Sequence, residues 1–509
     1  MLIKAVVIAS AVMFAGCTTG VSDKPNIVII YADDLDFSHL GCYGGNFLSP
    51  NIDNLARGGA RFDHYYASSP VCTASRYNLL TGRFAARCLD LERQFPAGDA
   101  ALIRWNTFLT EGEITVAHTL KDAGYVTGIV GKYHLYDNES EQTQLPPNAD
   151  PGDPEVKRII SENYHAAQKK IRAIAGFDYA ESIYANNLHA LGLPASMQVH
   201  NMEWITSGAL NFIVQNKEKP FFLYMATTIP HGPSPIASMQ SDPRITPAGT
   251  LQEPPVVQPK RPSVFERVKN AGLPDNASHI TWLDDAIGAV YKKLSDLDLL
   301  ENTLIILASD HGGEKGKMTC YEGGARAPAI AYWKNHIMAG TVIDEIAANI
   351  DIVPTILDLG NIQKPAAVKL DGLSLWPLLQ AKQSDLREEL YLEVTYTRGI
   401  VTDEWKYIAV RFPKDVAEKL ASENGLKFNQ EGQPVITDVV AGEVRARYGV
   451  ARDYPGYYDS DQLYHLNMDP DEQENLAFDP RYLSKLNELK LKLKEFSRDL
   501  PHAFGEFKE

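Results

Sequence analysis

Acids, histidines and a lysine directly follow four short apolar runs of the chain, and these residue types can bind metals or transfer protons. They are Asp33-Asp34, Lys132 with His134, His231, and Asp310-His311. Because ligands of open α/β sheets bind beyond the carboxyl ends of the strands, we expect all of them at one rim. Adjacent carboxylates repel each other unless a cation lies between them, so a divalent metal is predicted there. One such motif alone is more often a helix N-cap, but four together favour a functional site.

A longer motif runs from Cys72 to Arg83 and reads Cys-Thr-Ala-Ser-Arg-Tyr-Asn-Leu-Leu-Thr-Gly-Arg. The pattern predicts that Cys72 begins a helix, where free backbone amides and the helix dipole stabilise an anionic oxygen or sulfur. Arg76 lies one turn further along and can pair with that anion. A thiolate nucleophile and a buried structural cysteine are the alternatives that these residues leave open.

The apolar runs that must position these motifs are short and rich in Val, Ile, Leu and aromatic residues. They span Asn26–Tyr31, Val126–Val130, Phe221–Met225 and Thr303–Ala308. With helical patterns between them, they predict buried strands in an α/β fold with a large, mostly parallel central sheet flanked by helices. The segment from Ser234 to His279 is dense in proline and polar residues, which predicts a long surface loop.

Between Leu375 and Arg387 the pattern changes to that of a shorter α+β region. The chain then closes with an amphipathic helix. Its apolar stripe consists of Leu483, Leu486, Leu489, Leu493 and Phe496.

The first residues predict an export signal. Met1–Lys4 is a short positive start, and Ala5–Ala15 is an apolar run too short to span a bilayer as a helix. The end of this segment, Phe14-Ala15-Gly16-Cys17, resembles a bacterial lipobox, in which the cysteine is acylated. Residues 1–17 are therefore predicted to be a lipoprotein signal peptide, with Cys17 anchoring the exported protein to the bacterial outer membrane, on its periplasmic or surface side. Plain secretion, with Cys17 incidental, is the alternative.

Composition excludes several classes of protein. The 509 residues are 44% hydrophobic and 22% charged, which is ordinary for a globular protein and unlike collagen, coiled coil or disorder. Lys and Arg number 49 against 65 Asp and Glu, a formal net charge of −16. This balance argues against nucleic acid as a partner, since that needs a broad basic face. Five cysteines are too few for a disulfide scaffold.

The motif that begins at Cys72 resembles the signature of the type I sulfatases of the alkaline phosphatase superfamily, Cys-x-(Pro or Ala)-Ser-Arg with a Thr-Gly-Arg ending. Matching pieces extend over nearly the whole mature chain. They include Asp33-Asp34, Gly131-Lys132-Tyr133-His134, Pro230-His231-Gly232-Pro233, Ser309-Asp310-His311-Gly312, Lys317, Tyr321-Glu322-Gly323-Gly324-Ala325-Arg326, Trp405-Lys406-Tyr407 and Leu463-Tyr464-His465-Leu466. The resemblance implies a sulfuric ester hydrolase with an alkaline-phosphatase-like fold. A catalytic domain over 24–378 would be followed by a smaller α+β domain with an antiparallel sheet over 388–509.

The resemblance also implies a set of site residues. Asp33, Asp34, Asp310 and His311 look like ligands of one calcium ion. Cys72 would be converted to formylglycine by a maturation enzyme and would face the same ion. The hydrated aldehyde would then attack sulfur.

The remaining motif residues would assist this attack. Arg76 would help to ionise the aldehyde hydrate, and Lys132 and Lys317 look like clamps on the sulfate oxygens. His231 looks like the general acid for the leaving alcohol, and His134 would take a proton from the second hydroxyl.

Three functions are weighed on these residues. The first is a sulfatase acting on sulfated carbohydrate, since an envelope lipoprotein suits the breakdown of external polysaccharides. The second is a phosphate or phosphonate ester hydrolase of the same superfamily, because both anions are tetrahedral. The third is a lipoprotein that binds sulfated glycans without turnover. Ala74 stands where the oxygen-dependent maturation enzyme prefers proline, which favours a radical-type maturase.

Overall fold

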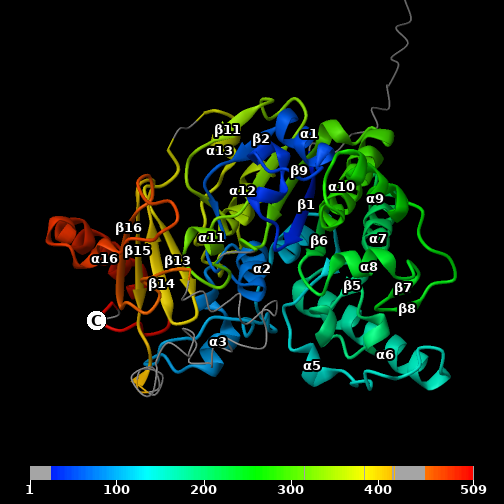
Figure 1. Cartoon of the computed structure of the whole chain (residues 1–509), viewed down its shortest axis with the longest axis horizontal. Coiled ribbons are helices and arrows are strands. Elements are labelled where there is room, and N and C mark those ends of the chain that lie inside the picture. The colour runs from blue at the N-terminus through cyan, green and yellow to red at the C-terminus, as the bar shows by residue number, and fades with distance from the viewer. Residues whose placement is uncertain (1–23, 314–315, 383–384, 415–417, 419–452, 508–509) are drawn as a thin grey trace, which may run out of the picture.

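The computed structural model describes residues 24–313, 316–382, 385–414, 418 and 453–507. Within these ranges an eight-stranded sheet lies at the centre of the molecule, in the order β11-β2-β10-β9-β1-β6-β4-β5 (Figure 1). In that order the strands span Thr341–Ile343, Ala60–Phe62, Ala329–Tyr332, Thr303–Ser309, Asn26–Asp33, Phe221–Pro230, Val126–Lys132 and Tyr179–Tyr184.

The four apolar runs form strands β1, β4, β6 and β9, as predicted. With β5 they pair in parallel, and the residues of β1 and β9 are buried on both faces. This two-sided burial explains why their sequences are continuously apolar rather than alternating. Strand β10 is the exception, because the chain stays at the carboxyl end of β9 and β10 then runs back antiparallel to it. The mostly parallel central sheet is confirmed.

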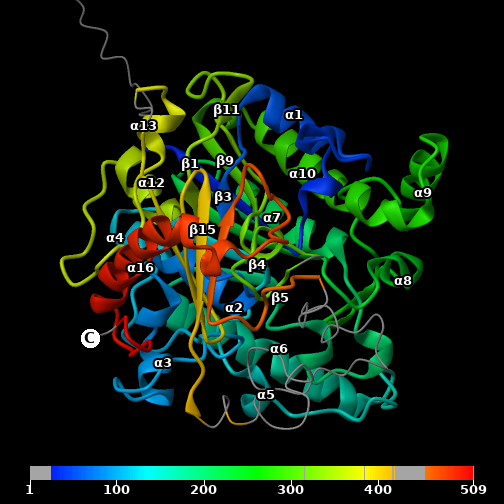
Figure 2. The same ribbon diagram turned by 60° about the vertical axis from the view of Figure 1, so that its left-hand side comes forward.

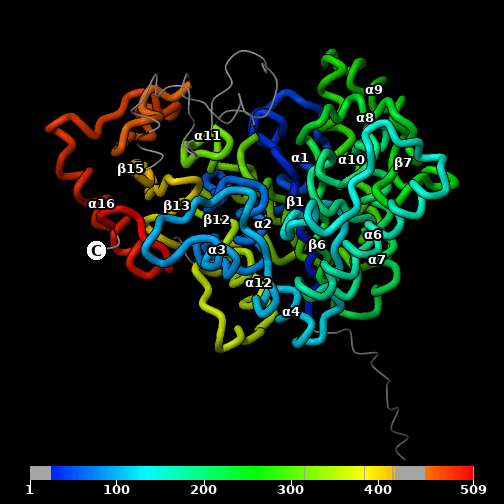
Figure 3. The backbone as a smooth tube through the Cα atoms, turned by 90° about the horizontal axis from the view of Figure 1, so that it is seen from below, coloured from blue at the N-terminus to red at the C-terminus, as the bar shows by residue number. Residues whose placement is uncertain are grey.

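Helices cover both faces of this sheet. Helices α7 and α10 lie on one side of it, and α2 and α12 lie on the other (Figures 1 and 3). The longer helices are α1 Pro50–Gly58, α2 Cys72–Thr81, α6 Pro154–Ala175, α7 Met202–Gln215, α9 Arg261–Asn270, α10 Ser278–Asp296 and α12 Ile352–Leu359. The shorter ones are α3 Leu89–Gln94, α4 Val116–Asp122, α5 Asn138–Glu141, α8 Pro235–Gln240, α11 Glu322–Ala325 and α13 Trp376–Leu379.

The segment from Ser234 to His279 is not a long loop, so this prediction is wrong. It contains α8, α9 and a short hairpin of β7 (Ile245–Thr246) and β8 (Gly249–Thr250). Two of its prolines, Pro235 and Pro262, lie in the first turns of α8 and α9, where the missing N–H is tolerated. Arg261 in this segment is buried and pairs with Glu203 of α7 at 2.8 Å, so its charge does not belong to a solvated face.

The C-terminal region forms a second sheet, which is antiparallel as predicted and has the strand order β13-β14-β15-β16 (Figures 1 and 2). Its strands span Leu390–Val394, Thr397–Val401, Trp405–Val410 and Asp461–His465, and helix α16 spans Leu483–Arg498. In α16, Leu486, Leu489 and Leu493 are buried, but Leu483 is 53% exposed. Leu483 therefore does not belong to the packed stripe. It is the first residue of the helix, one turn short of the packed segment.

Residues 1–17, with the predicted signal peptide and Cys17, lie outside the described residues. In the part of the chain that is described, every helix is too short or too polar to cross a membrane. The described cysteines, Cys42, Cys72, Cys88 and Cys320, are free thiols. The domain limits at 24–378 and 388–509 stay a prediction.

Asp284 of α10 ties that helix to α1, and its replacement by alanine is expected to destabilise the fold. Its buried carboxylate accepts hydrogen bonds from Asn51 N (3.1 Å), Asn51 Nδ2 (2.7 Å) and Ile52 N (2.8 Å). Alanine would leave these donors unpaired, so the free energy of unfolding should fall by about 2–4 kcal/mol in urea denaturation. Asp296→Ala on the same helix, which breaks an exposed pair with Lys292, is the control. Equal losses in both variants would contradict the capping role.

Candidate active site

The polar motifs meet at the carboxyl ends of the parallel strands, as predicted. Asp33 ends β1 and Lys132 ends β4, while His231 and Asp310 directly follow β6 and β9. Backbone bonds link these strand ends, since His231 N donates to Asp33 O at 3.0 Å. Because β1 lies between β6 and β9, its acids lie at the centre of the site.

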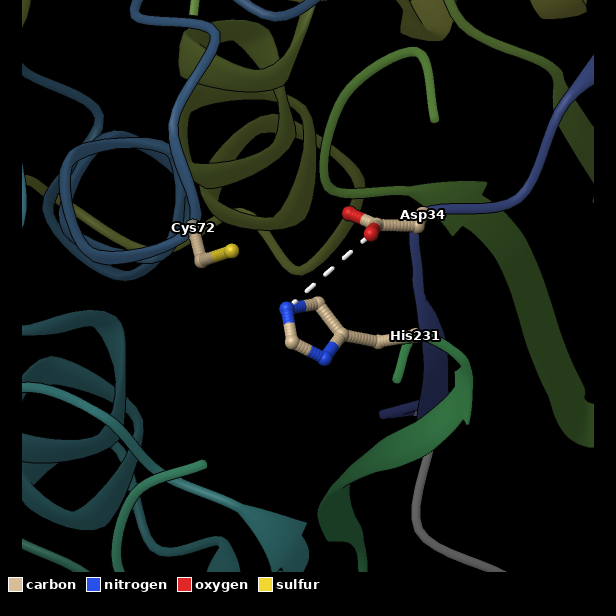
Figure 4. A group of neighbouring side chains, drawn as sticks. All are labelled: Asp34, Cys72 and His231. Atoms are coloured by element: carbon tan, nitrogen blue, oxygen red, sulfur yellow. Dashed lines mark ion pairs between the residues drawn. The ribbon is translucent and has the colours of Figure 1, made fainter. Parts of the chain in front are cut away.

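Cys72 is the first residue of α2 and is buried, which confirms the predicted helix start. Its Sγ lies 3.3 Å from His311 Nε2. Figure 4 shows that the Cys72 sulfur, the His231 ring and the Asp34 carboxylate point toward one another from three different elements. The amino end of α2 therefore presents Cys72 to the strand ends, where its unpaired amides favour negative charge.

Two lysines bind the first two carboxylates. Lys132 Nζ donates to the Asp33 oxygens at 2.8 and 3.0 Å, and Lys317 Nζ donates to the Asp34 oxygens at 2.7 and 2.8 Å. Lys132 and Lys317 are only 1% and 2% exposed. Neither lysine is therefore a solvated surface residue, although most lysines in proteins are.

Arg76 joins the remaining carboxylate to the cluster. Its Nη2 donates to Asp33 Oδ1 at 3.1 Å and to Asp310 Oδ2 at 3.0 Å, and its Nη1 donates to Lys132 O at 3.1 Å. Arg76 is fully buried. The sequence suggested that it would pair with an anion at Cys72, but its ion pairs in the structure are with Asp33 and Asp310.

Burial disfavours the charge on every carboxyl of the cluster, but the neighbours separate their pKa values. At Asp33 burial is outweighed by Lys132, His231 and Arg76 together, which hold its pKa well below the ordinary value. Lys317 likewise lowers the pKa of Asp34. At Asp310 burial prevails and raises the pKa. Asp33 and Asp34 are therefore the firmly ionised members of the cluster.

The histidines differ in the same way. Burial lowers the pKa of His231 to about 4 and that of His134 well below its ordinary value. His231 Nε2 lies 4.0 Å from Asp34 Oδ2. Burial would also lower the pKa of His311, but the charges of Asp310 and Cys72 raise it to about 9. His134 is thus a neutral base, whereas His311 favours the protonated form.

The donor atoms fit a hard cation. Three overlapping groups of ligand atoms lie within 4.8 Å of one another: Asp33, Asp34 and Asp310; Cys72, Asp310 and His311; and Asp34, Cys72 and His231. Carboxylate oxygens dominate the first group, which is the donor chemistry of Ca²⁺. All of the predicted ligands are in these groups, so the residues present fit a divalent metal.

Three residues at the same place have a strained backbone conformation. Asp34 (φ 68°), His134 (φ 57°) and Met318 (φ 62°), the neighbour of Lys317, occupy the left-handed region that disfavours side chains other than glycine. Such strain persists where the surrounding structure over-determines it, which is typical of functional sites.

The sequence did not reveal the contacts that hold α2 in place. Ser75 Oγ lies 2.7 Å from Tyr31 OH, and Asn349 Nδ2 donates to Ser75 O at 3.2 Å. Ser75 is part of the Cys72 motif, but nothing in the sequence near Asn349 marks it as a neighbour of that helix. Asn349 lies in the turn Asn349–Asp351 directly before α12, and only the packing of this turn on α2 brings it to Ser75.

Comparison with known proteins identifies the family. The sequence profile of the sulfatases matches residues 25–362, about two thirds of the chain. The chain belongs to the sulfatase family. A second profile, the C-terminal region of N-sulphoglucosamine sulphohydrolase, matches residues 312–424. As a sulfatase, the protein is an enzyme that hydrolyses sulfate esters, and the family in general implies a formylglycine and a divalent metal.

Similar sulfatases cover most of the chain. Human arylsulfatase A is 32% identical over 411 residues, which are 75% of this chain and 73% of that protein. The N-acetylgalactosamine-6-O-sulfatase of Bacteroides thetaiotaomicron is 27% identical over 548 aligned positions, covering 92% and 93%. A solved structure from the glycosaminoglycan metabolism of that bacterium superposes with a TM-score of 0.63 at 24% identity, covering 93% of this chain and 99% of that one. The likeness confirms the predicted alkaline-phosphatase-like fold.

Proposed function

We propose that this sulfatase removes sulfate from sulfated carbohydrates, with a formylglycine derived from Cys72 and one Ca²⁺ ion as its cofactors. The observation that supports the proposal most directly is the position of Cys72. It begins α2, is buried, and faces His311 and Asp34 among three carboxylates and two lysines.

In this proposal Asp33, Asp34, Asp310 and His311 hold the metal, and the modified Cys72 faces it. A bound Ca²⁺ supplies Lewis acidity, which lowers the pKa of a nearby hydroxyl. The formylglycine would supply a hydrated aldehyde as the nucleophile, a group that can part from sulfate by returning to the aldehyde. A serine would instead leave a sulfate ester that needs a separate hydrolysis.

The chain's own cations prepare the site for an anion. Arg76 keeps Asp33 and Asp310 in place by donating to both. Lys132 and Lys317 hold their ammonium groups within 3 Å of Asp33 and Asp34, which places two positive charges at the carboxylate cluster. We propose that they stabilise the negative charge that moves onto the sulfate oxygens during transfer.

His134 and His231, whose pKa values are both lowered by burial, take opposite roles in proton transfer. His134 is neutral at pH 7, because burial and the neighbouring Lys132 lower its pKa, so it can accept a proton from a hydroxyl at the nucleophile. His231 must carry a proton to donate it to the leaving alcohol. Asp33 and Asp34 already act to raise its pKa, and a bound anionic ester would do the same.

The substrate class follows from two observations. A similar protein that covers nearly the whole chain is named an N-acetylgalactosamine-6-O-sulfatase. The N-terminal segment ending at Cys17 resembles a lipoprotein signal, so we place the enzyme on the outer membrane, facing the periplasm or the outside. Its partners would be the sulfated glycan and a formylglycine-generating maturase. Nucleic acid is not expected, given the net charge of −16.

The proposal is tested with protein exported by its own host. Ion chromatography would compare sulfate and phosphate release from matched sugar esters, and mass spectrometry would weigh the peptide that contains Cys72. We expect sulfate release to dominate and the thiol to be converted to an aldehyde. Faster phosphate release would support the alternative, a phosphate or phosphonate ester hydrolase. Aryl sulfates turned over far faster than every sulfated glycan would refute the carbohydrate substrate.

His231→Gln is expected to slow the enzyme according to its leaving group. A general acid contributes about 10²–10⁴-fold when the leaving alcohol is poor, as a sugar is, and little when it is a nitrophenol. The loss in kcat/KM should therefore be large for a sugar sulfate and small for nitrophenyl sulfate. Thr228→Val, on the same strand end but hydrogen-bonded to His200 and outside the proposed proton path, is the control. An equal loss for both substrates would assign His231 to another role.

A further inference from the structure

The motif Trp405-Lys406-Tyr407 lies on β15 of the C-terminal sheet, and none of the steps above uses it. We propose that Lys406 is a positioning residue. Through Glu322 and Glu472 it holds residues 316–319, the Lys317 turn, against the active site. This inference rests on the proposed function, in which Lys317 binds the sulfate group.

Lys406 lies between two carboxylates. It is fully buried, with its Nζ 2.7 Å from Glu322 Oε1 and 3.1 Å from Glu472 Oε1. Glu472 is also fully buried, and Tyr66 OH donates to Glu322 Oε1 at 3.1 Å. Without the ammonium group, two carboxylates would face each other in a low-dielectric interior, where like charges repel strongly.

Glu322 connects Lys406 to the part of the chain that carries the active site. It begins the one-turn helix α11, and its backbone N donates to Glu472 Oε2 at 2.6 Å. Both the side chain and the backbone of Glu322 are therefore bound by the C-terminal region. A shift of Lys406 or Glu472 would move the start of α11.

The Lys317 turn packs directly on α11. A Cβ placed on Gly324 would lie 1.9 Å from Gly316 O, and one on Gly316 would lie 3.0 Å from Gly324 N. Gly316 has φ +89°, a conformation that a residue with a side chain could adopt only with strain. No side chain separates the two segments, so α11 cannot move without displacing residues 316–319.

Further contacts hold the segment from Gly316 to Ala325 in place. The ring of Tyr321 stacks on that of Tyr454 with centroids 3.8 Å apart and an angle of 2° between the planes, and its OH donates to Gln462 Oε1 at 2.6 Å. At the other end, Met318 N donates to Pro70 O at 3.2 Å, close to the start of α2. The segment that carries Lys317 thus bridges the C-terminal sheet and the Cys72 helix.

Lys406→Met in the full chain tests the inference. Methionine keeps the length of the side chain but removes the ammonium group that lies between Glu322 and Glu472. We expect kcat/KM for sulfate release to fall roughly 10- to 100-fold, because small misplacements of a binding group have effects of that size. In a Lys317→Ala background the same change should have little further effect, since coupled residues are not additive.

Lys490→Met is the matched control. It breaks an ion pair of α16 with Asp461 of β16, at 2.9 Å, in the same C-terminal region but away from α11. We expect its kcat/KM to stay close to that of the wild type. If Lys406→Met fails to fold, as judged by near-ultraviolet circular dichroism, Glu322→Gln weakens the same contact with a neutral side chain of the same shape.

A second readout needs no turnover. Acetylation of Lys317, followed by mass spectrometry, should be slow in the wild type, where this lysine is buried, and several-fold faster in Lys406→Met and Glu322→Gln. Unchanged labelling in the folded variants, or full additivity with Lys317→Ala, would overturn the inference. A wild-type enzyme that releases no sulfate would instead refute the proposed function, and the labelling experiment would still decide the positioning role.

Discussion

Cys72→Ala is expected to abolish catalytic sulfate release, lowering kcat by about 10⁴-fold or more, since alanine cannot be converted to the proposed formylglycine, whose hydrate would supply the attacking oxygen. The side chain is buried at the start of α2, and its Sγ is 3.3 Å from His311 Nε2. Alanine removes this atom without adding volume, so the fold should persist. Sulfate release from a sulfated oligosaccharide, measured by ion chromatography, checks the prediction.

Cys42→Ala provides the control for the loss of a thiol. Cys42 is a free, partly exposed cysteine that lies apart from the carboxylate cluster. Its replacement should leave turnover unchanged. Binding of the sulfated glycan to Cys72→Ala should also persist, because the proposed sulfate clamps remain. Turnover retained by Cys72→Ala would show that this residue is not the nucleophile, and a wild-type protein that binds without turnover would support the non-catalytic alternative.

Removal of divalent metal is expected to inactivate the enzyme and to lower its thermal stability. Asp33, Asp34 and Asp310 place carboxylate oxygens within 4.8 Å of one another, which favours a bound cation. A ligand present at about 100 times its Kd stabilises the folded state by about 2.7 kcal/mol. Chelation should therefore lower the Tm by several degrees, and Ca²⁺ should restore both the Tm and the activity more fully than Mg²⁺. Differential scanning calorimetry and sulfate release check the two effects.

Two variants separate the metal site from general electrostatics. Asp310→Asn should weaken the response of the Tm to Ca²⁺. Asp36→Asn alters a nearby carboxylate that accepts a hydrogen bond from Gly313 N at 3.0 Å, outside the groups of potential ligands, and it should keep that response. If neither chelator nor Ca²⁺ changes the Tm of the wild type, a metal in this cluster would be refuted.

Local patterns were sufficient for the four central parallel strands of the sheet and for the position of the site, but not for β2, β5, β10 and β11. The runs that became β1, β4, β6 and β9 are buried on both faces, and such strands are recognisable from continuous apolar sequence. Their parallel pairing brings the residues that follow them to one edge, whatever the details of the packing. The helix start at Cys72 was equally local, because it depends on a few neighbouring residues.

The errors arose where local composition has two possible outcomes. Prolines between Ser234 and His279 are compatible with a loop or with the first turns of helices, and the buried pair of Arg261 with Glu203 selects the helices. Leu483 has the spacing of the apolar stripe of α16. A residue of such a stripe is buried only where a neighbouring element covers it, and Leu483 is not covered. Burial of an individual side chain thus depends on the neighbouring element.

The sequence by itself determined the family signature, the α/β class and the set of chemically active residues. Only the tertiary structure decided their pairing: Lys132 with Asp33, 99 residues apart, Lys317 with Asp34, 283 apart, and Lys406 with Glu322, 84 apart. A buried charge must find a partner of opposite sign, and many residues in the chain could supply one. Which of them does so depends on the packing of whole elements, because only neighbours in space can remove the desolvation penalty.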